Sequence, residues 1–499
     1  MRKIIIDGAS LTIEEVRAVA TEDVFVELAD KVIPQIIKAE VMVADYLKQG
    51  KVAYGINTGF GRLSETIIAT EDSAQLQENL IMSHACGVGE ALDEEVVRAM
   101  MLLRINSLVK GHSGIRLSTL ASLLAMLNKR VYPLVFEKGS LGASGDLCPL
   151  AHLALVLIGK GEAWYQGERI AGAKALQLAG ITPVQLSAKE GLALINGTQL
   201  MSAIACLLVS ASRKLADYCD LSLSLTMEAL GGIIEAYNLE VHKLRPHRGQ
   251  LISANNVRTN LSGSEYLSHQ GQLRLQDAYS LRCGAQVHGS CRDAIEHLAD
   301  KLNIEINAVS DNPLLFPDSD QIISGGNFHG ESLALALDYL GLALAELANI
   351  SERRIERLVN PQLNNSLPPF LAPDSGLNSG FMIAQYSAAA LVSENKVLAH
   401  PASVDSIPSS GNQEDHVSMG TIAANKARTI LKNSQTVIAI ELLSACQALD
   451  FLPKRKMGKA TQKVYENIRA LSEFVSSDRE LYLDIEKVRE LIERGKLCD

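Results

Sequence analysis

From residue 198 almost to its end, the sequence repeats apolar side chains at the three- to four-residue spacing of an α-helix. Several of these stretches are much longer than an average helix of about 11–12 residues. Long helices joined by short loops pack as neighbours in a bundle. The stretches that we expect to be helical run from about 198 to 230, 272 to 302, 330 to 358, 380 to 399, 414 to 450 and 481 to 495.

The amino-acid composition agrees with such a bundle. Of the 499 residues, 47% are hydrophobic but only 4% are aromatic, so the core has to be built from aliphatic side chains, which suit closely packed helices. We therefore expect a mainly α fold, with a large bundle of long helices over residues 201–499 and a smaller mixed part over residues 1–200. Within that first part, residues 3–6 read as a strand, residues 12–15 as a capping box and residues 163–170 as a hairpin.

Charge and cysteine content narrow the class of protein. The net charge of -10 argues against a general nucleic-acid surface. Eight cysteines are scattered without a C-x-x-C pair, and the first residues lack the apolar stretch of a signal peptide, which favours a reducing, cytoplasmic setting. The longest uncharged run, residues 191–212, contains Asn196 and Gln199, so we interpret it as a turn and a buried helix rather than a membrane span.

Residues 139–149 place three glycines, two serines and an alanine before an apolar segment. By the turn rules alone they form a tight turn, with Asp146 as the N-cap of the following helix. Ser144 does not fit the G-x-S-x-G elbow of hydrolases, because Asp146 stands where that pattern needs glycine. The tripeptide Ala143-Ser144-Gly145 by itself therefore predicts a turn and no chemistry.

Common metal and phosphate motifs are missing from the sequence. It contains no P-loop, no H-E-x-x-H and no Cys/His zinc spacing, so we expect no metal. Glu414, Asp415 and His416 are adjacent at an expected helix start, where neighbouring side chains point in different directions. An acidic first turn of a helix is the simpler interpretation of these residues.

From the residues alone, three other features could have either a structural or a functional role. The glycine-rich residues 54–61 form either a surface loop or a binding loop. His84 ends an apolar helix stripe, which is more typical of a structural histidine than of a catalytic one. Gln276, Tyr279 and Arg282 recur every three residues in an expected helix and could clamp a carboxylate, or they could form a solvated helix face.

Seven segments, in order along the chain, together resemble the aromatic amino acid ammonia-lyase family, whose members carry a methylidene-imidazolone (MIO) group. Each segment alone is a weak signal, whereas the set covers nearly the whole chain and is highly specific. The matching segments are residues 54–61, 83–89, 139–149, 190–198, 279–283, 325–329 and 412–419.

The resemblance implies a lyase that removes ammonia and a β-proton from an L-amino acid. It also implies that the Gly145 nitrogen attacks the Ala143 carbonyl while Ser144 loses water and becomes a dehydroalanine. The MIO group formed in this way would be the electrophile, and no external cofactor would be needed. The residue types suit this step, since Gly145 has no Cβ to hinder the approach of its nitrogen.

The resemblance assigns roles to further residues by their match to the family's motifs. Arg282 would bind the substrate carboxylate, a task for which a planar guanidinium is well shaped. Tyr54, Tyr279 and Glu414 are candidates for proton transfer, and the β-proton base is left open between Tyr54 and Glu414. A tyrosine titrates near 10, so a basic role for it requires a lowered pKa. The other implied contacts of the substrate or the MIO group are His84, Asn196, Gln276 and Phe328.

Two features favour L-histidine as the substrate, with trans-urocanate and ammonia as products. Ser83 and His84 stand where the phenylalanine and tyrosine enzymes of the family typically carry Phe-Leu or His-Leu, although some tyrosine-specific relatives also carry Ser-His. His84 and Glu414 could bond both imidazole nitrogens, which an apolar pocket would leave unpaired at a cost of about 1–3 kcal/mol each. An ammonia-lyase or aminomutase of the same family that acts on tyrosine or phenylalanine is the alternative.

The family's assembly is a homotetramer whose active sites draw residues from several subunits, so the resemblance implies the same assembly here. Shared sites would explain why His84, Arg282 and Glu414 are far apart in the sequence. We expect no nucleic-acid or membrane partner. From a different class, the chain could be a helical scaffold that has lost catalysis. Cys148 and His112 depart from the family's common residues, without removing a candidate catalytic group.

Overall fold

The computed structural model describes residues 2–498, and the chain divides into two compact units. The first unit consists of Met1–Ser210, Leu298–Asp338 and Pro401–Asn425, and the second of Ala211–His297, Tyr339–His400 and Lys426–Asp499. The single boundary near residue 200 stays a prediction. The chain passes from the first unit to the second after Ser210, and two later segments of the chain belong to the first unit again.

The fold is mainly α, as predicted, and α4 (Glu94–Leu108) is a central helix of the first unit. Every residue from Ala99 to Leu108 is buried, and α1 and α5 pack against this helix. The capping box at residues 12–15 is present at the start of α1. The helices that complete the early part of this unit are α1 (Ile13–Thr21), α2 (Ile33–Lys48), α5 (Leu117–Asn128) and α7 (Gly172–Leu178).

Three short helices of the first unit position the residues that the sequence singles out. α3 (Ser73–His84), α6 (Leu147–Leu157) and α8 (Glu190–Ile195) pack on one another. α3 ends at His84, α6 begins just after residues 143–145, and α8 ends just before Asn196. One packed group of helices therefore gathers three segments that lie far apart in the sequence.

The strands are short and form four small sheets among the described residues. The first pairs β1 with β2 in parallel, and the others are antiparallel: β3 with β5, β4 with β6 and β7, and β8 with β9. The expected strand at 3–6 and the expected hairpin at 163–170 are confirmed as β1 and as β6 with β7. The bounds are β1 (Arg2–Ile6), β2 (Val24–Leu28), β3 (Val88–Ala91), β4 (Tyr132–Pro133), β5 (Phe136–Lys138), β6 (Glu162–Tyr165), β7 (Glu168–Ala171), β8 (Leu314–Phe316) and β9 (Gln321–Ile323).

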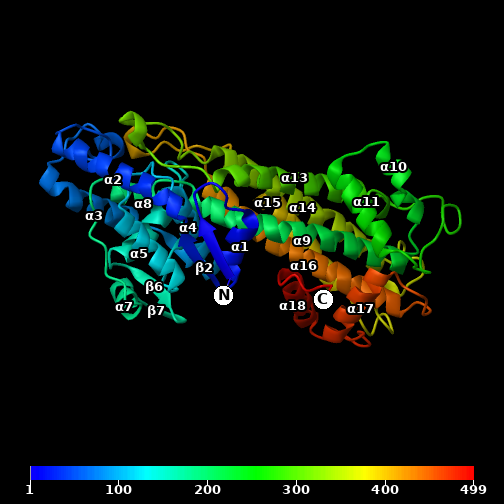
Figure 1. Ribbon diagram of the computed structural model, residues 1–499. Coiled ribbons are helices and arrows are strands. Elements are labelled where there is room, and N and C mark those ends of the chain that lie inside the picture. Colours follow the sequence, from blue (N-terminus) through cyan, green and yellow to red (C-terminus); the bar gives the residue numbers. More distant parts are fainter. Residues whose placement is uncertain (1, 499) are drawn as a thin grey trace. The chain divides into compact units, whose positions relative to one another are not determined.

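The second unit is held together by long helices that run side by side, among them α9 (Gln199–Leu230), α14 (Glu331–Val359) and α16 (Gly420–Asp450) (Figure 1). The fully buried carboxylate of Glu441 in α16 pairs with Arg354 in α14, at 2.5 and 2.8 Å. It also accepts hydroxyl hydrogen bonds from Ser222 and Thr226 in α9. The other helices are α10 (Leu239–Lys243), α11 (Arg248–Asn260), α12 (Tyr279–Arg282), α13 (Gly284–Glu305), α15 (Met382–Leu398), α17 (Lys459–Leu471) and α18 (Leu481–Glu493).

Within residues 2–498, α14 is the one helix long and apolar enough to cross a bilayer by length and composition. Of its most apolar 18-residue window, 67% is buried inside the protein. The core helix of a soluble protein has the same properties, so this helix is weak evidence for a membrane segment.

Two helix starts differ from the prediction. The helix expected from residue 272 is interrupted, because residues 272–278 are not helical and α12 covers only Tyr279–Arg282 before α13 begins. Here the Asp277 carboxylate accepts the Ile233 N–H at 2.7 Å, which holds the chain in a loop. The helix expected from residue 414 begins at Gly420, so Glu414 belongs to a loop and not to an acidic first turn.

Candidate active site

The loop of residues 139–146 links β5 to α6 and has a shape that requires two of its glycines. Gly142 and Gly145 have φ angles of +70° and +72°, in the left-handed region that side chains rarely adopt. A Cβ on Gly145 would lie 2.1 Å from the carbonyl oxygen of Gly197. The tripeptide Ala143-Ser144-Gly145 is therefore pressed against the turn that follows α8, without room for a side chain at its third residue.

Two backbone hydrogen bonds join the tripeptide to that turn. The Gly197 N–H donates to the Ser144 oxygen at 3.3 Å, and the Gly197 oxygen accepts from the Asp146 N–H at 2.6 Å. These two bonds use Ser144 O and Asp146 N. They leave the Gly145 N–H and the Ala143 carbonyl outside the pairing, and these are the two groups that a cyclisation would join.

The loop before α16 holds the tripeptide from its other end. The Met419 N–H donates to the Leu141 oxygen at 2.9 Å. The Ser418 hydroxyl donates to the Gly142 oxygen at 3.2 Å. The segment is thus fixed by residues from two distant parts of the sequence.

The carboxylate of Asp146 ties this loop to two long helices. Its Oδ2 accepts the Met201 N–H at 3.0 Å, in the first turn of α9, and its Oδ1 accepts the hydroxyl of Thr421 at the start of α16. Asp146 stands at the N-cap position of α6, as predicted, but its side chain makes no capping hydrogen bond there and binds the start of α9 instead. Asp146 is completely buried, and this burial raises the pKa of its carboxyl group to about 6.

A cavity of about 1020 Å³ lies in the first unit beside this loop. Its lining includes Tyr54 and residues 58–61 of the glycine-rich segment, the end of α3, the turn after α8 and the loops before α14 and α16. The structure brings together six of the residues predicted for the site: Tyr54, His84, Ser144, Asn196, Phe328 and Glu414.

Glu414 lies next to the tripeptide in this cavity. The Ser144 hydroxyl donates to its Oε1 at 3.5 Å, and the Ser409 hydroxyl donates to its Oε2 at 3.1 Å. Backbone bonds between Ser409 and Glu414, at 2.9 and 3.3 Å, fix the turn that carries the carboxylate. A proton acceptor is therefore held within reach of the serine hydroxyl, an arrangement that suits acid–base chemistry.

Burial shifts the pKa values of His84 and Tyr54 in the directions that favour the neutral form of each side chain. The pKa of His84 is lowered mainly by burial, which outweighs the opposite effects of the Leu80 backbone and of Glu414. The pKa of Tyr54 is raised mainly by burial, although its hydroxyl accepts the Gly61 N–H at 3.3 Å. The cavity therefore contains a neutral imidazole and a neutral phenol at pH 7.

Asn196 follows α8 and is 2% exposed. Its Nδ2 donates to Asp311 Oδ1 and to the Asn312 oxygen, both at 3.1 Å. Asp311 in turn pairs with Lys189. The buried Arg104 donates to the backbone oxygen of Asn196 at 2.7 Å.

The sequence reasoning missed Lys189, Asp311 and Arg104. An aspartate before Asn-Pro and a lysine within a capping pattern look like ordinary turn residues. No local signal indicates that Lys189 and Asp311 pair across a separation of 122 residues.

Ala143 and Gly145 flank Ser144 in the first unit, whereas the predicted site residues Gln276, Tyr279 and Arg282 belong to the second unit. Tyr279 is 71% exposed, and the Arg282 guanidinium lies 4.8 Å from the centre of its ring. Gln276 lies in the loop before α12, so the expected spacing of all three along one helix face is wrong. The loop is irregular because Arg274 and Asp277 bond locally.

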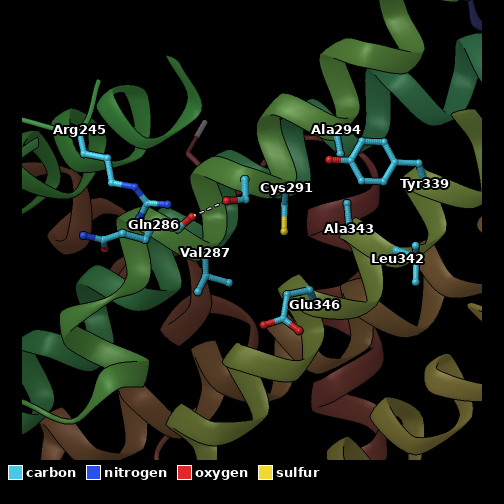
Figure 2. Close-up of a pocket in the computed structure, with 10 residues that line it drawn as sticks. Arg245, Gln286, Val287, Cys291, Ala294, Tyr339, Leu342, Ala343 and Glu346 are labelled. Carbon is cyan, nitrogen blue, oxygen red and sulfur yellow. Dashed lines mark hydrogen bonds between the residues drawn. The ribbon is translucent and has the colours of Figure 1, made fainter. Parts of the chain in front are cut away.

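A smaller hollow of about 450 Å³ lies in the second unit between α13 and α14, and Figure 2 shows its mostly apolar wall of Val287, Ala294, Leu342 and Ala343. Burial raises the pKa of the Cys291 thiol in this wall to about 12, so the thiol is a poor nucleophile. Within residues 2–498, no group of three or more His, Cys, Asp or Glu side chains could hold a metal ion. The cavity beside the tripeptide therefore remains the candidate active site.

Residues 11–470 of the chain match the family described as aromatic amino acid lyase. A protein named histidine ammonia-lyase, from Caldanaerobacter subterraneus subsp. tengcongensis, is 58% identical over 497 residues, covering 100% of this chain and 98% of that protein. Another protein of that name, from Alkaliphilus oremlandii, is 55% identical over 499 residues, with coverages of 100% and 98%.

Solved structures with the same fold include an ammonia-lyase and an aminomutase. The crystal structure of histidine ammonia-lyase from Trypanosoma cruzi has a TM-score of 0.92 and 44% identity, covering 100% of this chain and 94% of that one. The structure of tyrosine aminomutase from Streptomyces globisporus has a TM-score of 0.96 and 38% identity, with coverages of 99% and 97%.

Proposed function

Because the chain belongs to the aromatic amino acid lyase family, we propose that it is a carbon–nitrogen lyase that converts L-histidine to trans-urocanate and ammonia, the first step of histidine degradation. The observation that carries the proposal is the cavity in which Ser144 of the tripeptide meets His84 and Glu414. Full-length relatives named histidine ammonia-lyase support the same substrate.

The tripeptide has the features that MIO formation requires. Cyclisation would join the Gly145 nitrogen to the Ala143 carbonyl carbon, with loss of that oxygen as water, and Ser144 would lose its hydroxyl and its α-proton as a second water. The fit rests on the left-handed Gly145, on its close approach to Gly197 and on the two joining groups that lie outside the backbone pairing. When formed, MIO supplies an electrophile that no ordinary side chain offers.

His84 and Glu414 are the proposed partners of the imidazole ring. His84 is neutral at pH 7 because its pKa is lowered, so it can accept or donate one hydrogen bond, whereas a carboxylate accepts only. Such a pair satisfies both nitrogens of a neutral imidazole, one as a donor and one as an acceptor. A ring without nitrogens would leave these two half-buried groups unpaired, at a cost of up to about 1–3 kcal/mol each.

Proton transfer is assigned to Glu414 and the tyrosines Tyr54 and Tyr279. The raised pKa of Tyr54 favours a neutral phenol that donates a proton, because a phenolate base would need a lowered pKa. Glu414 faces the tripeptide and is our choice for the β-proton acceptor. Phe328 supplies an apolar wall to the cavity.

Arg282, with Gln276, is the proposed carboxylate clamp, and we propose that it acts within a homotetramer whose sites are shared between subunits. Exposed apolar side chains on α14 and α15 of the second unit support self-association: Tyr339, Leu342, Ile383, Tyr386 and Val397 are 47–73% exposed. Light scattering on the active protein tests this assembly, and an active monomer would exclude it. The seven cysteines from Cys86 to Cys446 form no disulfide, which supports the proposed cytoplasmic location.

The substrate test uses purified protein and the ultraviolet absorbance of urocanate. We expect a rise with L-histidine and an intact mass that is two waters below that of the unmodified chain. For Ser144→Ala we expect the unmodified mass, no urocanate and an unchanged fold, since the loop already accepts alanine at residue 143. Full activity of Ser144→Ala would contradict the MIO assignment.

The second candidate function is an ammonia-lyase or aminomutase acting on tyrosine or phenylalanine. The observation in its favour is the structural likeness to a tyrosine aminomutase at 38% identity. Incubation with each aromatic amino acid, followed by chromatography of the products, separates the candidates. Turnover of tyrosine or phenylalanine without turnover of histidine would replace the substrate and keep the family.

A further inference from the structure

A fully buried ion pair lies behind the candidate active site. Lys189 Nζ and Asp311 Oδ2 are 2.9 Å apart, and both side chains have no exposed surface. Lys189 precedes α8 with a left-handed φ of +70°, a conformation that costs a non-glycine residue roughly 1–2 kcal/mol. Removing two charges from water is also costly, so this pair is expensive to keep, which suggests a role beyond stability.

The second oxygen of Asp311 determines the orientation of a side chain in the cavity wall. Asp311 Oδ1 accepts from Asn196 Nδ2 at 3.1 Å, and the Asn312 backbone oxygen accepts from the same nitrogen at 3.1 Å. Two acceptors on one side of the amide require its NH₂ group there, because an amide oxygen would be repelled by both. Asn196 therefore has one allowed orientation.

The other end of this amide is an unused acceptor. Asn196 Oδ1 is buried and has no hydrogen-bond partner among residues 2–498, and Asn196 is one of the residues that line the cavity. Its backbone is fixed too, because Arg104 donates to the Asn196 oxygen and the Ala193 oxygen. A buried acceptor without a donor costs free energy, which is recovered when a ligand supplies an N–H group.

We propose that Lys189 and Asp311 are positioning residues, which hold Asn196 so that its Oδ1 accepts an N–H from the α-amino group of an amino-acid ligand. Asp311 acts by binding the NH₂ end of Asn196, and Lys189 acts by holding the Asp311 carboxylate in place. This inference rests on the proposed function, since it takes the ligand to be an amino acid.

The test compares two ligands that differ only in the α-amino group. L-histidine and imidazole-4-propionate are titrated by calorimetry into Ser144→Ala protein, which binds without turnover, and into the same protein carrying Asp311→Asn. An asparagine at residue 311 can present its own NH₂ group to Asn196, which lets the side-chain amide of Asn196 flip. We expect the Asp311→Asn protein to bind L-histidine about 5- to 150-fold more weakly than the Ser144→Ala parent does. Imidazole-4-propionate should bind to both proteins with the same affinity.

The matched control is Asp318→Asn. Asp318 pairs with Lys38 at 2.8 Å in the same unit, but both side chains are more than half exposed, so we expect neither ligand to change in affinity. If Asp311→Asn does not fold, the double variant Lys189→Met with Asp311→Asn removes both charges together and carries the same expectation. In an Asn196→Ala background, Asp311→Asn should weaken L-histidine binding no further.

Two results overturn the inference. An equal loss for both ligands means that the ion pair only supports the loop, and no loss for either means that Asn196 does not need it. Both results leave the proposed function intact if the parent protein releases urocanate from histidine. A parent without that activity, and a Ser144→Ala variant that binds no L-histidine, would instead remove the proposed function and the inference with it.

Discussion

The replacement Gly145→Ala tests the packing of the tripeptide directly. A Cβ at this residue would lie 2.1 Å from the Gly197 oxygen and 2.4 Å from its carbonyl carbon, and these are backbone atoms that no rotamer change can move. The left-handed φ of +72° adds about 1–2 kcal/mol for a non-glycine residue. Relief of the clash has to separate the two hydrogen bonds to Gly197, at about 1–3 kcal/mol each. The expected destabilisation of the first unit is therefore about 3–8 kcal/mol.

The control for this replacement is Gly167→Ala in the turn between β6 and β7. Gly167 has a similar φ of +83°, but nothing lies within 4 Å of its would-be Cβ, so it should cost only about 1–2 kcal/mol. Urea unfolding followed by circular dichroism compares the two variants with the parent, and intact mass reports the loss of two waters. We expect Gly145→Ala to unfold at much lower urea and to keep its unmodified mass. Equal midpoints for the two variants, with both masses two waters lower, would refute the reasoning.

Two further predictions concern buried charges. Arg354→Met should destabilise the second unit by about 3–5 kcal/mol, because it leaves Glu441 buried without its cation. Arg494→Met, which removes an exposed pair with Glu490, should cost less than about 1 kcal/mol. Free energies of unfolding from urea titrations that differ by less than about 1 kcal/mol between the two variants would contradict this. Asp146 has a pKa near 6 when folded and 3.8 as a free group, so the folded state holds its proton more tightly. Its contribution to stability is fully present below pH 3.8 and is lost as the pH rises through 6, by about 3 kcal/mol. Urea midpoints at pH 5 and pH 7 for the parent and Asp146→Asn measure this, and an identical pH dependence in both would exclude it.

The helices from residue 198 onward were predictable because a long apolar repeat leaves one way to bury it. α9 and α14 begin within one residue of their predicted starts. The failures lie where a loop is held by side chains from elsewhere. Glu414 looks like a helix start in the sequence, but backbone bonds with Ser409 hold it in a turn and postpone the helix to Gly420.

The candidate site was predictable to the extent that its residues belong to recognisable segments. Ser144, His84 and Glu414 were identified that way, and they meet in one cavity. Lys189 and Asp311 were not identified, because a buried ion pair between two ordinary turn residues has no local pattern. The orientation of the Asn196 amide is likewise a property of three-dimensional contacts, which spacing along the chain does not encode.

The attachment of Asp146 to Met201 and Thr421 has a consequence for protein synthesis. The ribosome delivers the tripeptide well before it delivers Ser418 and Met419, which hold the loop from its other end, and Thr421, which binds Asp146. A nascent chain that stops before Ser418 contains the reactive residues without half of their support. Any chemistry that depends on the completed loop therefore waits until residues 418–421 have been synthesised.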